Sequence, residues 1–263
     1  MIRYVSAVLA FAAMWISIPE PAPPPMRLDA GATATSAAMR SAGYDWLATD
    51  RQFIAFDPAG DGRLIEVFGS LASARRVAVI VPGSDTNLST YDRGLAVKAR
   101  QLYGELLAED PSARVAVVAW LGYDTPDGLG LAAVREDRAA AGAAELERFV
   151  STLPSTAEVV LIGHSYGTVV VSLALPSLAA RVTDAVFLAS PGLPVDPPAG
   201  VRTWSATATS DWVNRVPKIR IVGLGHGDAP SFTALPVGEV TGHDGYFTAP
   251  STLEAIAGVV RGG

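Results

Sequence analysis

The chain has 263 residues, of which 49% are apolar, and this is enough to build the buried core of one larger domain. Its 20 basic and 26 acidic residues give a formal charge of -6 and are not gathered into blocks, which argues against nucleic-acid binding and against a basic membrane-surface helix. Cysteine is absent, so disulfides, cysteine–zinc sites and thiol catalysis are excluded.

The N-terminal residues 1–25 have the pattern of an export signal followed by a linker. Arg3 precedes an apolar run at 4–18, which as a helix would reach about 22 Å. A hydrocarbon core is about 30 Å thick, so the run is short for a span and suits a signal peptide. A short retained anchor and a buried helix are the alternatives. The proline-rich stretch 19–25 is the expected linker, and 26–263 the expected single domain. We therefore expect an exported protein, extracellular or in the cell envelope, with membrane or envelope association if the N-terminus is retained.

From about residue 50, short strands and helices alternate along the chain. Strands at 51–56 and 63–68 flank an Asp-Pro and Asp-Gly turn and predict an antiparallel hairpin. The later strands are rich in valine and isoleucine without alternation, which is typical of parallel strands covered on both faces. These strands are 76–83, 114–120, 158–165, 184–192, 202–211 and 218–225, and the expected helices are 92–109, 131–153, 166–175 and 251–260. The alternation predicts an α/β fold with a mainly parallel, doubly wound sheet.

The sequence GHSYG at 163–167 stands between a predicted buried strand and a predicted helix. It fits G-x-S-x-G, the nucleophile elbow, in which Gly163 and Gly167 leave room around a strained Ser165. Active sites of doubly wound sheets lie at the carboxyl ends of strands, where Ser165 is expected. The amide of Tyr166, at the start of the helix, would be one oxyanion donor. The plainer interpretation makes Ser165 only the N-cap of that helix.

A serine hydroxyl needs a neighbouring base, and imidazole suits that task near neutral pH. The histidines are His164, His226 and His243. Because side chains of neighbouring residues diverge at an elbow, we expect His164 to pack or hydrogen-bond beneath it. His243 lies on a loop before the last helix, where the order serine, acid, histidine places the base. We therefore favour His243 over His226, which follows an earlier strand.

The third member of the triad should orient the imidazole and come from a strand end between the serine and the histidine. The aspartates in that interval are Asp184, Asp196, Asp211 and Asp228. Asp184 precedes its strand, and Asp196 lies in a proline-rich turn. Asp211 ends the strand 202–211, so we favour it over Asp228, which stays as the alternative. The plainer interpretation of Asp211 is the N-cap of a short helix.

Three further features bear on the pocket. The Pro-Gly pair before Ser84 ends an earlier strand, so the backbone amide of Ser84 is the expected second oxyanion donor. Trp120 and Tyr123 follow a neighbouring strand and are the expected substrate-binding wall, with a packed loop as the alternative. The segment after 184–192 is too short for a large lid, which leaves an open cleft with residues 28–50 as its expected partial roof.

Several blocks together resemble a known family. They include AFDPAGDGRLIEVFG, VAVIVPGSDTN, LIGHSYGTVV and FLASPG, and the resemblance covers roughly residues 50–250. The chain resembles the actinobacterial α/β-hydrolase family of unknown function called DUF1023. The resemblance implies an α/β-hydrolase fold with Ser165 as nucleophile, and it supports Asp211 and His243 as its partners. The pair Ser84-Asp85 departs from the other small residues that related chains often carry there.

These observations predict an exported serine hydrolase, an esterase of the EC 3.1.1 class that acts through an acyl-enzyme on Ser165. We expect no metal and no cofactor, and a small-molecule or lipid-like ester as substrate. One alternative keeps the elbow but transfers the acyl group to an envelope acceptor. The other is a non-catalytic binding protein on a hydrolase fold, against which the complete set of serine, aspartate and histidine argues.

Overall fold

The structure is a computed structural model that describes residues 24–27, 31–128, 137–215 and 232–263. Its strands are β1 (Phe53–Asp57), β2 (Arg63–Gly69), β3 (Arg76–Val81), β4 (Val115–Leu121), β5 (Glu158–His164), β6 (Val182–Leu188), β7 (Arg202–Ala206) and β8 (Thr233–Ala234). Within those residues they form one sheet of 8 strands in the order β1-β2-β4-β3-β5-β6-β7-β8. β1 and β2 form the expected antiparallel hairpin, β2 is also antiparallel to β4, and the other neighbours are parallel. The expected α/β fold is confirmed.

The expected parallel strands correspond to β3, β4, β5, β6 and β7, while the strand expected at 218–225 lies outside the described residues. β7 is shorter than expected because the chain turns after Ala206, where the amide of Asp211 donates to the carbonyl of Ala208 at 3.0 Å. The connection 189–201 between β6 and β7 contains no helix, so no lid is inserted there.

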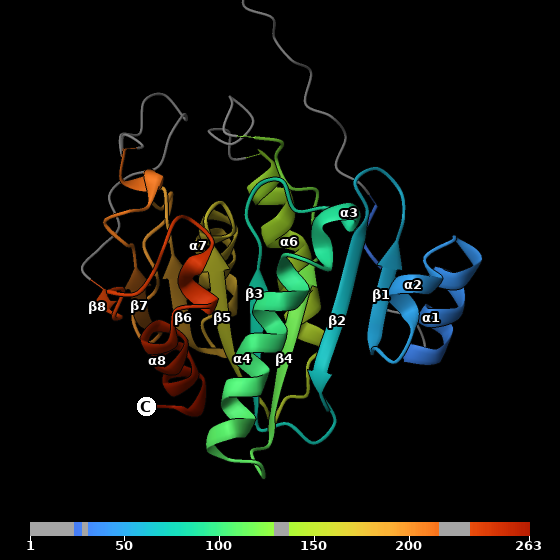
Figure 1. Ribbon diagram of the computed structural model, residues 1–263, viewed down its shortest axis with the longest axis horizontal. Helices are drawn as coiled ribbons and strands as arrows, with labels where there is room; N and C mark the ends of the chain where they lie inside the picture. The colour runs from blue at the N-terminus through green and yellow to red at the C-terminus, as the bar shows by residue number, and fades with distance from the viewer. Residues whose placement is uncertain (1–23, 28–30, 129–136, 216–231) are drawn as a thin grey trace, which may run out of the picture.

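Helices cover both faces of the sheet, as Figure 1 shows. The long helices are α4 (Leu95–Glu109), α6 (Asp137–Thr152), α7 (Gly167–Leu178) and α8 (Pro250–Arg261). Along β4, Val117 and Ala119 belong to the apolar cluster under α4 and α8, whereas Val118 and Trp120 belong to the cluster under α6 and α7. Successive strand side chains point to opposite faces, so each continuous apolar strand supplies both cores.

The helix expected at 92–109 forms as α4 but begins at Leu95, and a separate short helix precedes it, which matters for the site. α3 (Leu88–Tyr91) is capped by Asn87, whose side chain accepts from the amide of Thr90 at 3.1 Å. Gly94 then precedes α4, which begins at Leu95. The first turn of α4 consequently starts near the carboxyl ends of the parallel strands, at the upper end of the sheet in Figure 1.

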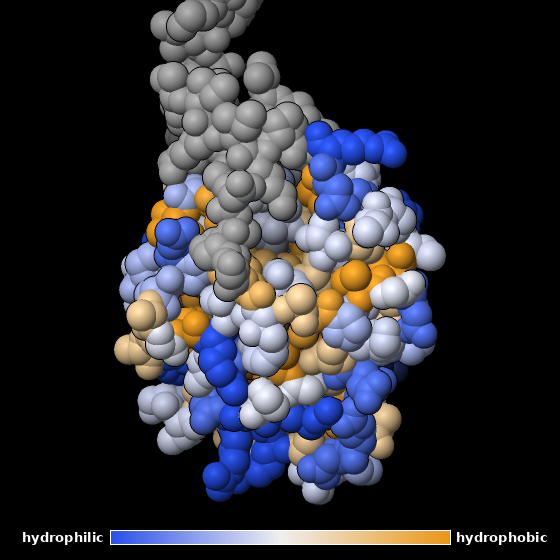
Figure 2. Space-filling view, turned by 90° about the vertical axis from the view of Figure 1, so that its left-hand side faces the viewer, coloured by the Kyte–Doolittle hydropathy of each residue, from blue (hydrophilic) through white to orange (hydrophobic). Residues whose placement is uncertain are grey.

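The two edges of the sheet have different surroundings. α1 (Ala32–Ser41) and α2 (Asp45–Ala48) pack beside β1, where Met39 and Leu47 are buried in the same cluster as Phe53. The roof expected from residues 28–50 is therefore wrong for the described part of that segment, because its apolar side chains cover the hairpin instead. Figure 2 looks onto the opposite, β8 side, where hydrophilic residues gather at the lower end of the face. Among the described residues, none of the helices has the length and apolar character that crossing a membrane requires.

Candidate active site

The sharp turn after β5 places Ser165 in the left-handed region, at φ 54°. A Cβ on Gly163 would lie 2.8 Å from the Cα of Thr168, and one on Gly167 would lie 2.3 Å from the carbonyl oxygen of Val81. Only glycine fits at either position, as the elbow motif predicts. The side chain of Ser165 does not cap α7, whose cap residue is Tyr166 and has no side-chain cap bond. The plainer N-cap interpretation of Ser165 is therefore wrong.

Asp211 and His243 meet at the same end of the sheet, where the Nδ1 of His243 is 2.8 Å from the Oδ1 of Asp211. The carboxylate also accepts from the amide of Val213 at 2.9 Å and from the hydroxyl of Tyr246 at 2.7 Å. A carboxylate can only accept, so the Nδ1 of His243 carries the proton and its Nε2 is the basic nitrogen. Asp211 thus contacts the imidazole of His243, and its Oδ1 also accepts from the start of the turn that follows it.

One cavity of about 720 Å³ joins these groups, since Ser165 and His243 both line it. The cavity falls within the range typical of small-molecule sites. Trp212 lines it as well, and its ring centroid is 4.5 Å from that of His243. This aromatic wall was missed in the sequence, where only its position next to Asp211 could have revealed it.

The loop after β3 passes directly against Ser165. A Cβ on Gly83 would lie 2.7 Å from the Cβ of Ser165 and 3.2 Å from its Oγ, so only glycine allows this approach. Ser84 follows at the cavity wall, and among the described residues its amide has no backbone hydrogen-bond partner. Asp85, at φ 59°, accepts from the amide of Gly128 at 2.7 Å and so ties the loop to the segment after β4. The amides of Tyr166 and Ser84 thus come from the two segments that border Ser165.

Trp120 and Tyr123 are not the substrate wall that the sequence predicted. Both are buried, stack on each other with centroids 6.0 Å apart, and do not line the cavity among the described residues. The physical reason is strand alternation, which points Trp120 to the side of α6 and α7. Tyr123 still contributes indirectly, because its hydroxyl donates to the carbonyl of Pro82 at 2.7 Å and holds the loop beside Ser165.

His164 is buried and hydrogen-bonds, as expected, but its partner is the backbone oxygen of His243 at 2.8 Å, and it lines the cavity as well. Burial and, second, the charge of Lys98 lower its pKa to about 3, so the ring is neutral near pH 7. His226 and Asp228, the alternative base and acid, lie outside the described residues. In the described ranges, no group of three or more histidine, cysteine, aspartate and glutamate side chains is arranged to hold a metal ion.

Known proteins show similarity to this chain. A model of the family described as alpha/beta hydrolase matches residues 57–221. An uncharacterized protein of Mycobacterium tuberculosis is 34% identical in an alignment of 211 residues that covers 70% of this chain and 76% of that protein. Of the solved structures, a carboxylesterase from Mesorhizobium loti has 19% identity and a TM-score of 0.48, over 76% of this chain and 95% of that chain. A serine hydrolase without a lid from Xanthomonas campestris has 14% identity and a TM-score of 0.45, over 81% and 93%.

Proposed function

The chain belongs to the alpha/beta-hydrolase family, and from this premise we propose that it is a serine esterase that cleaves carboxylic esters through an acyl-enzyme on Ser165. One observation carries the proposal. A buried aspartate, Asp211, holds the Nδ1 of His243 at 2.8 Å, while His243 and an elbow serine line the same cavity. This is the set of nucleophile, base and orienting acid that acyl transfer requires.

The proposed reaction has two balanced halves. The Nε2 of His243 takes the proton of Ser165 as its Oγ attacks the ester carbonyl, and Asp211 stabilises the imidazolium that forms. The amides of Tyr166 and Ser84 donate to the oxyanion. When the intermediate collapses, the alcohol leaves with the proton from His243 and the acyl group stays on Ser165. A water molecule then attacks the acyl-enzyme by the same route and releases the acid.

The cavity fits esters of moderate size with mixed polarity. Its wall combines apolar side chains such as Leu95 and Trp212 with hydroxyl and charged side chains such as Thr241 and Arg93. No lid is inserted between β6 and β7, so one part of the substrate can extend into solvent. We propose the ester class from the size and mixed lining of this cavity.

The test is active-site labelling with a fluorophosphonate, which reacts only with an activated serine. Wild-type protein should be labelled, and Ser165→Ala should abolish labelling. Ser112→Ala is the matched control, because Ser112 is an exposed serine bonded only to Asp110 and should leave labelling unchanged. Folded wild-type protein that stays unlabelled, or a labelled Ser165→Ala variant, would contradict the proposal. Turnover of short-chain and long-chain p-nitrophenyl esters would then define the acyl preference.

We also propose that the protein is exported. This proposal is supported by the apolar run 4–18, which lies outside the described residues, and by the proline-rich linker 19–25. Expression in a mycobacterial host, fractionation and N-terminal sequencing provide the test. A mature N-terminus beyond residue 18 in the culture medium or envelope supports export, whereas full-length protein confined to the cytosol contradicts it.

A further inference from the structure

A second polar network lies beside the proposed triad and takes no part in the chemistry above. The Nε2 of His164 is 2.8 Å from the backbone oxygen of His243. The Nζ of Lys98 is 2.6 Å from the Oδ1 of Asp244 and 3.5 Å from the Nδ1 of His164. These groups come from the end of β5, the first turn of α4 and the loop before the turn η2 (Gly245–Phe247). The end of β5 and the first turn of α4 therefore converge on the loop that carries the proposed base.

The protonation states of the network are mutually consistent. His164 is buried, and its pKa of about 3 keeps it neutral. A neutral ring that donates from Nε2 to a carbonyl must accept at Nδ1, and the ammonium of Lys98 is the donor that faces Nδ1. Although burial opposes it, the charge of Lys98 holds the pKa of Asp244 below its usual range, so this carboxylate stays ionised opposite the ammonium. The side chains of Lys98, His164 and Asp244 thus stabilise one another's protonation states.

The loop that carries His243 needs such a restraint. Gly242, at φ 68°, precedes the histidine, and Gly245 follows Asp244. Glycine on both sides gives the backbone more freedom to lose on folding than other residues would. The bond between His243 and Asp211 fixes the ring but not the backbone, whereas His164 holds the backbone oxygen of His243 itself.

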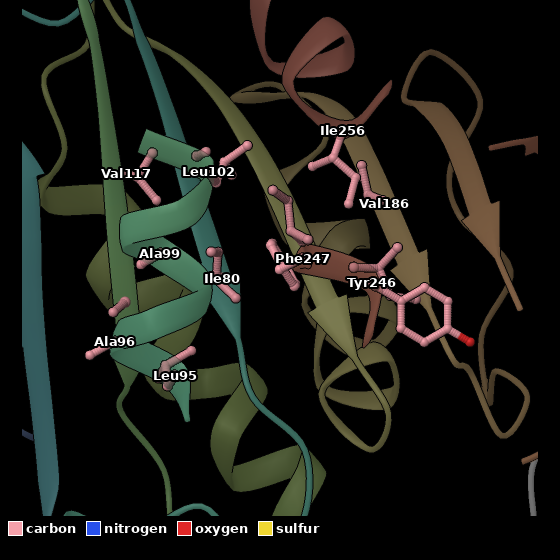
Figure 3. Packing of buried hydrophobic residues seen from close by; sticks show 14 of the residues in the cluster. Ile80, Leu95, Ala96, Ala99, Leu102, Val117, Val186, Tyr246, Phe247 and Ile256 are labelled. Carbon is pink, nitrogen blue, oxygen red and sulfur yellow. The ribbon is translucent and has the colours of Figure 1, made fainter. Parts of the chain in front are cut away.

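The connectivity couples the base to the nucleophile. His164 immediately precedes Ser165 in the chain, and Asp244 immediately follows His243. A hydrogen bond between His164 and His243 therefore sets the position of the base relative to the serine. On the same side of the sheet, Leu95 of α4 and Phe247 of η2 belong to one buried apolar cluster, part of which is drawn in Figure 3.

We propose that Lys98 and His164 are positioning residues that hold the His243 loop in register with Ser165, so that Nε2 of the base stays within reach of the nucleophile. The proposal rests on the proposed function for its kinetic consequences, but not for its structural ones. Misplacement of a catalytic group by about 1 Å can cost on the order of 100-fold in rate. Lys98, His164 and Asp244 also line the cavity. Loss of the network should therefore lower kcat by a larger factor than it raises KM.

The kinetic experiment uses paired variants on a p-nitrophenyl ester. His164→Leu removes the donor and should lower kcat by about 100-fold, while His164→Gln keeps an N–H donor and should recover much of that loss. Lys98→Met should lower kcat by about 10-fold, and Lys98→Arg should restore it. In a double-mutant cycle, Lys98→Met with Asp244→Asn should lose no more than Lys98→Met alone, since both act through one contact. A wild-type kcat in folded His164→Leu would overturn the proposal, as would His164→Gln failing as badly as His164→Leu.

A second readout needs no turnover and separates this proposal from the esterase proposal. The chain has 3 histidines, so its imidazole NMR signals can be resolved and assigned. In wild type, the ring of His164 should keep a protected Nε2–H, and the ring of His243 should give one sharp set of signals. In Lys98→Met the His243 signals should broaden or split. If wild type shows these signals but no labelling, the esterase proposal fails and the positioning proposal stands. If the His243 signals are the same in both proteins, the positioning proposal fails.

Discussion

Two buried polar networks occupy opposite parts of the sheet, and only one of them has the features of a catalytic site. At the hairpin edge, the guanidinium of Arg51 makes two bonds of 2.7 Å to Glu66, and the hydroxyl of Tyr91 donates to the same carboxylate at 2.8 Å. At the carboxyl end, Asp211 holds His243 with comparable geometry. The difference is that every charge of the hairpin network faces a partner within it, whereas His243 faces a cavity that also contains a serine. Burial of charge alone therefore does not identify an active site.

The largest expected effect tests the catalytic side of this comparison. Asp211→Asn removes the charge that stabilises imidazolium and disturbs the tautomer of His243, so kcat should fall by about 10³- to 10⁴-fold. The thermal midpoint should change little in comparison, because the asparagine oxygen can still accept from the amide of Val213. Ester turnover and thermal unfolding measure the two effects. Near-normal turnover in this variant would transfer the role of the acid to Asp228.

The next effect tests the structural side. Glu66→Gln leaves the half-buried Arg51 without its main counter-charge, and breaking a buried ion pair costs about 3–5 kcal/mol of the free energy of unfolding. Asp92→Asn is the matched control, since Asp92 bonds the same guanidinium at 2.6 Å but is largely exposed, and such a pair contributes about 0–1 kcal/mol. Urea unfolding measures the free energy of unfolding of the two variants. Fluorophosphonate labelling per folded molecule should stay at the wild-type level in each variant, and a selective loss in Glu66→Gln would erase the distinction between the two networks.

The smallest effect concerns pH. The pKa of His164 falls from 6.5 to about 3 on folding, chiefly through burial, so between these values the unfolded chain binds the extra proton and the folded chain does not. The stabilisation is thus complete above about pH 6.5 and decreases as the pH falls toward about 3. Wild type should therefore lose more unfolding free energy between about pH 7 and about pH 4.5 than His164→Gln, as urea unfolding would show. Equal losses would mean that His164 is accessible to protons in the folded state.

The parts of the site that could be predicted from sequence are those fixed by local backbone geometry. Gly163 and Gly167 indicate the elbow in the sequence, because no other residue type fits at these two positions between β5, α7 and β3. Asp211 and His243 could be ranked from their positions at the end of a strand and before the last helix. The wrong assignment of Trp120 arose because a strand end was identified without deciding which face its side chain takes.

The network around Lys98 could not have been found in the sequence. Lys98, His164 and Asp244 are separated by long stretches of chain, and no spacing rule relates the first turn of a helix to a loop near the C-terminus. The start of α4 after Gly94 also had to be known, because it determines which groups the side chain of Lys98 can contact. Contacts of this kind depend on tertiary packing. In contrast, the hairpin and the parallel strands followed from patterns within each segment.

The positive φ of Ser165 has a consequence for how this protein tolerates change. A non-glycine residue held in this conformation costs on the order of 1–3 kcal/mol, and the neighbouring glycines Gly83, Gly163 and Gly167 leave no space into which the turn could relax. Folding stability and the presentation of the hydroxyl are thus opposed at this one residue. Selection for thermal robustness alone would favour glycine at position 165, and a more stable descendant obtained in that way would have lost the hydroxyl that we propose as the nucleophile.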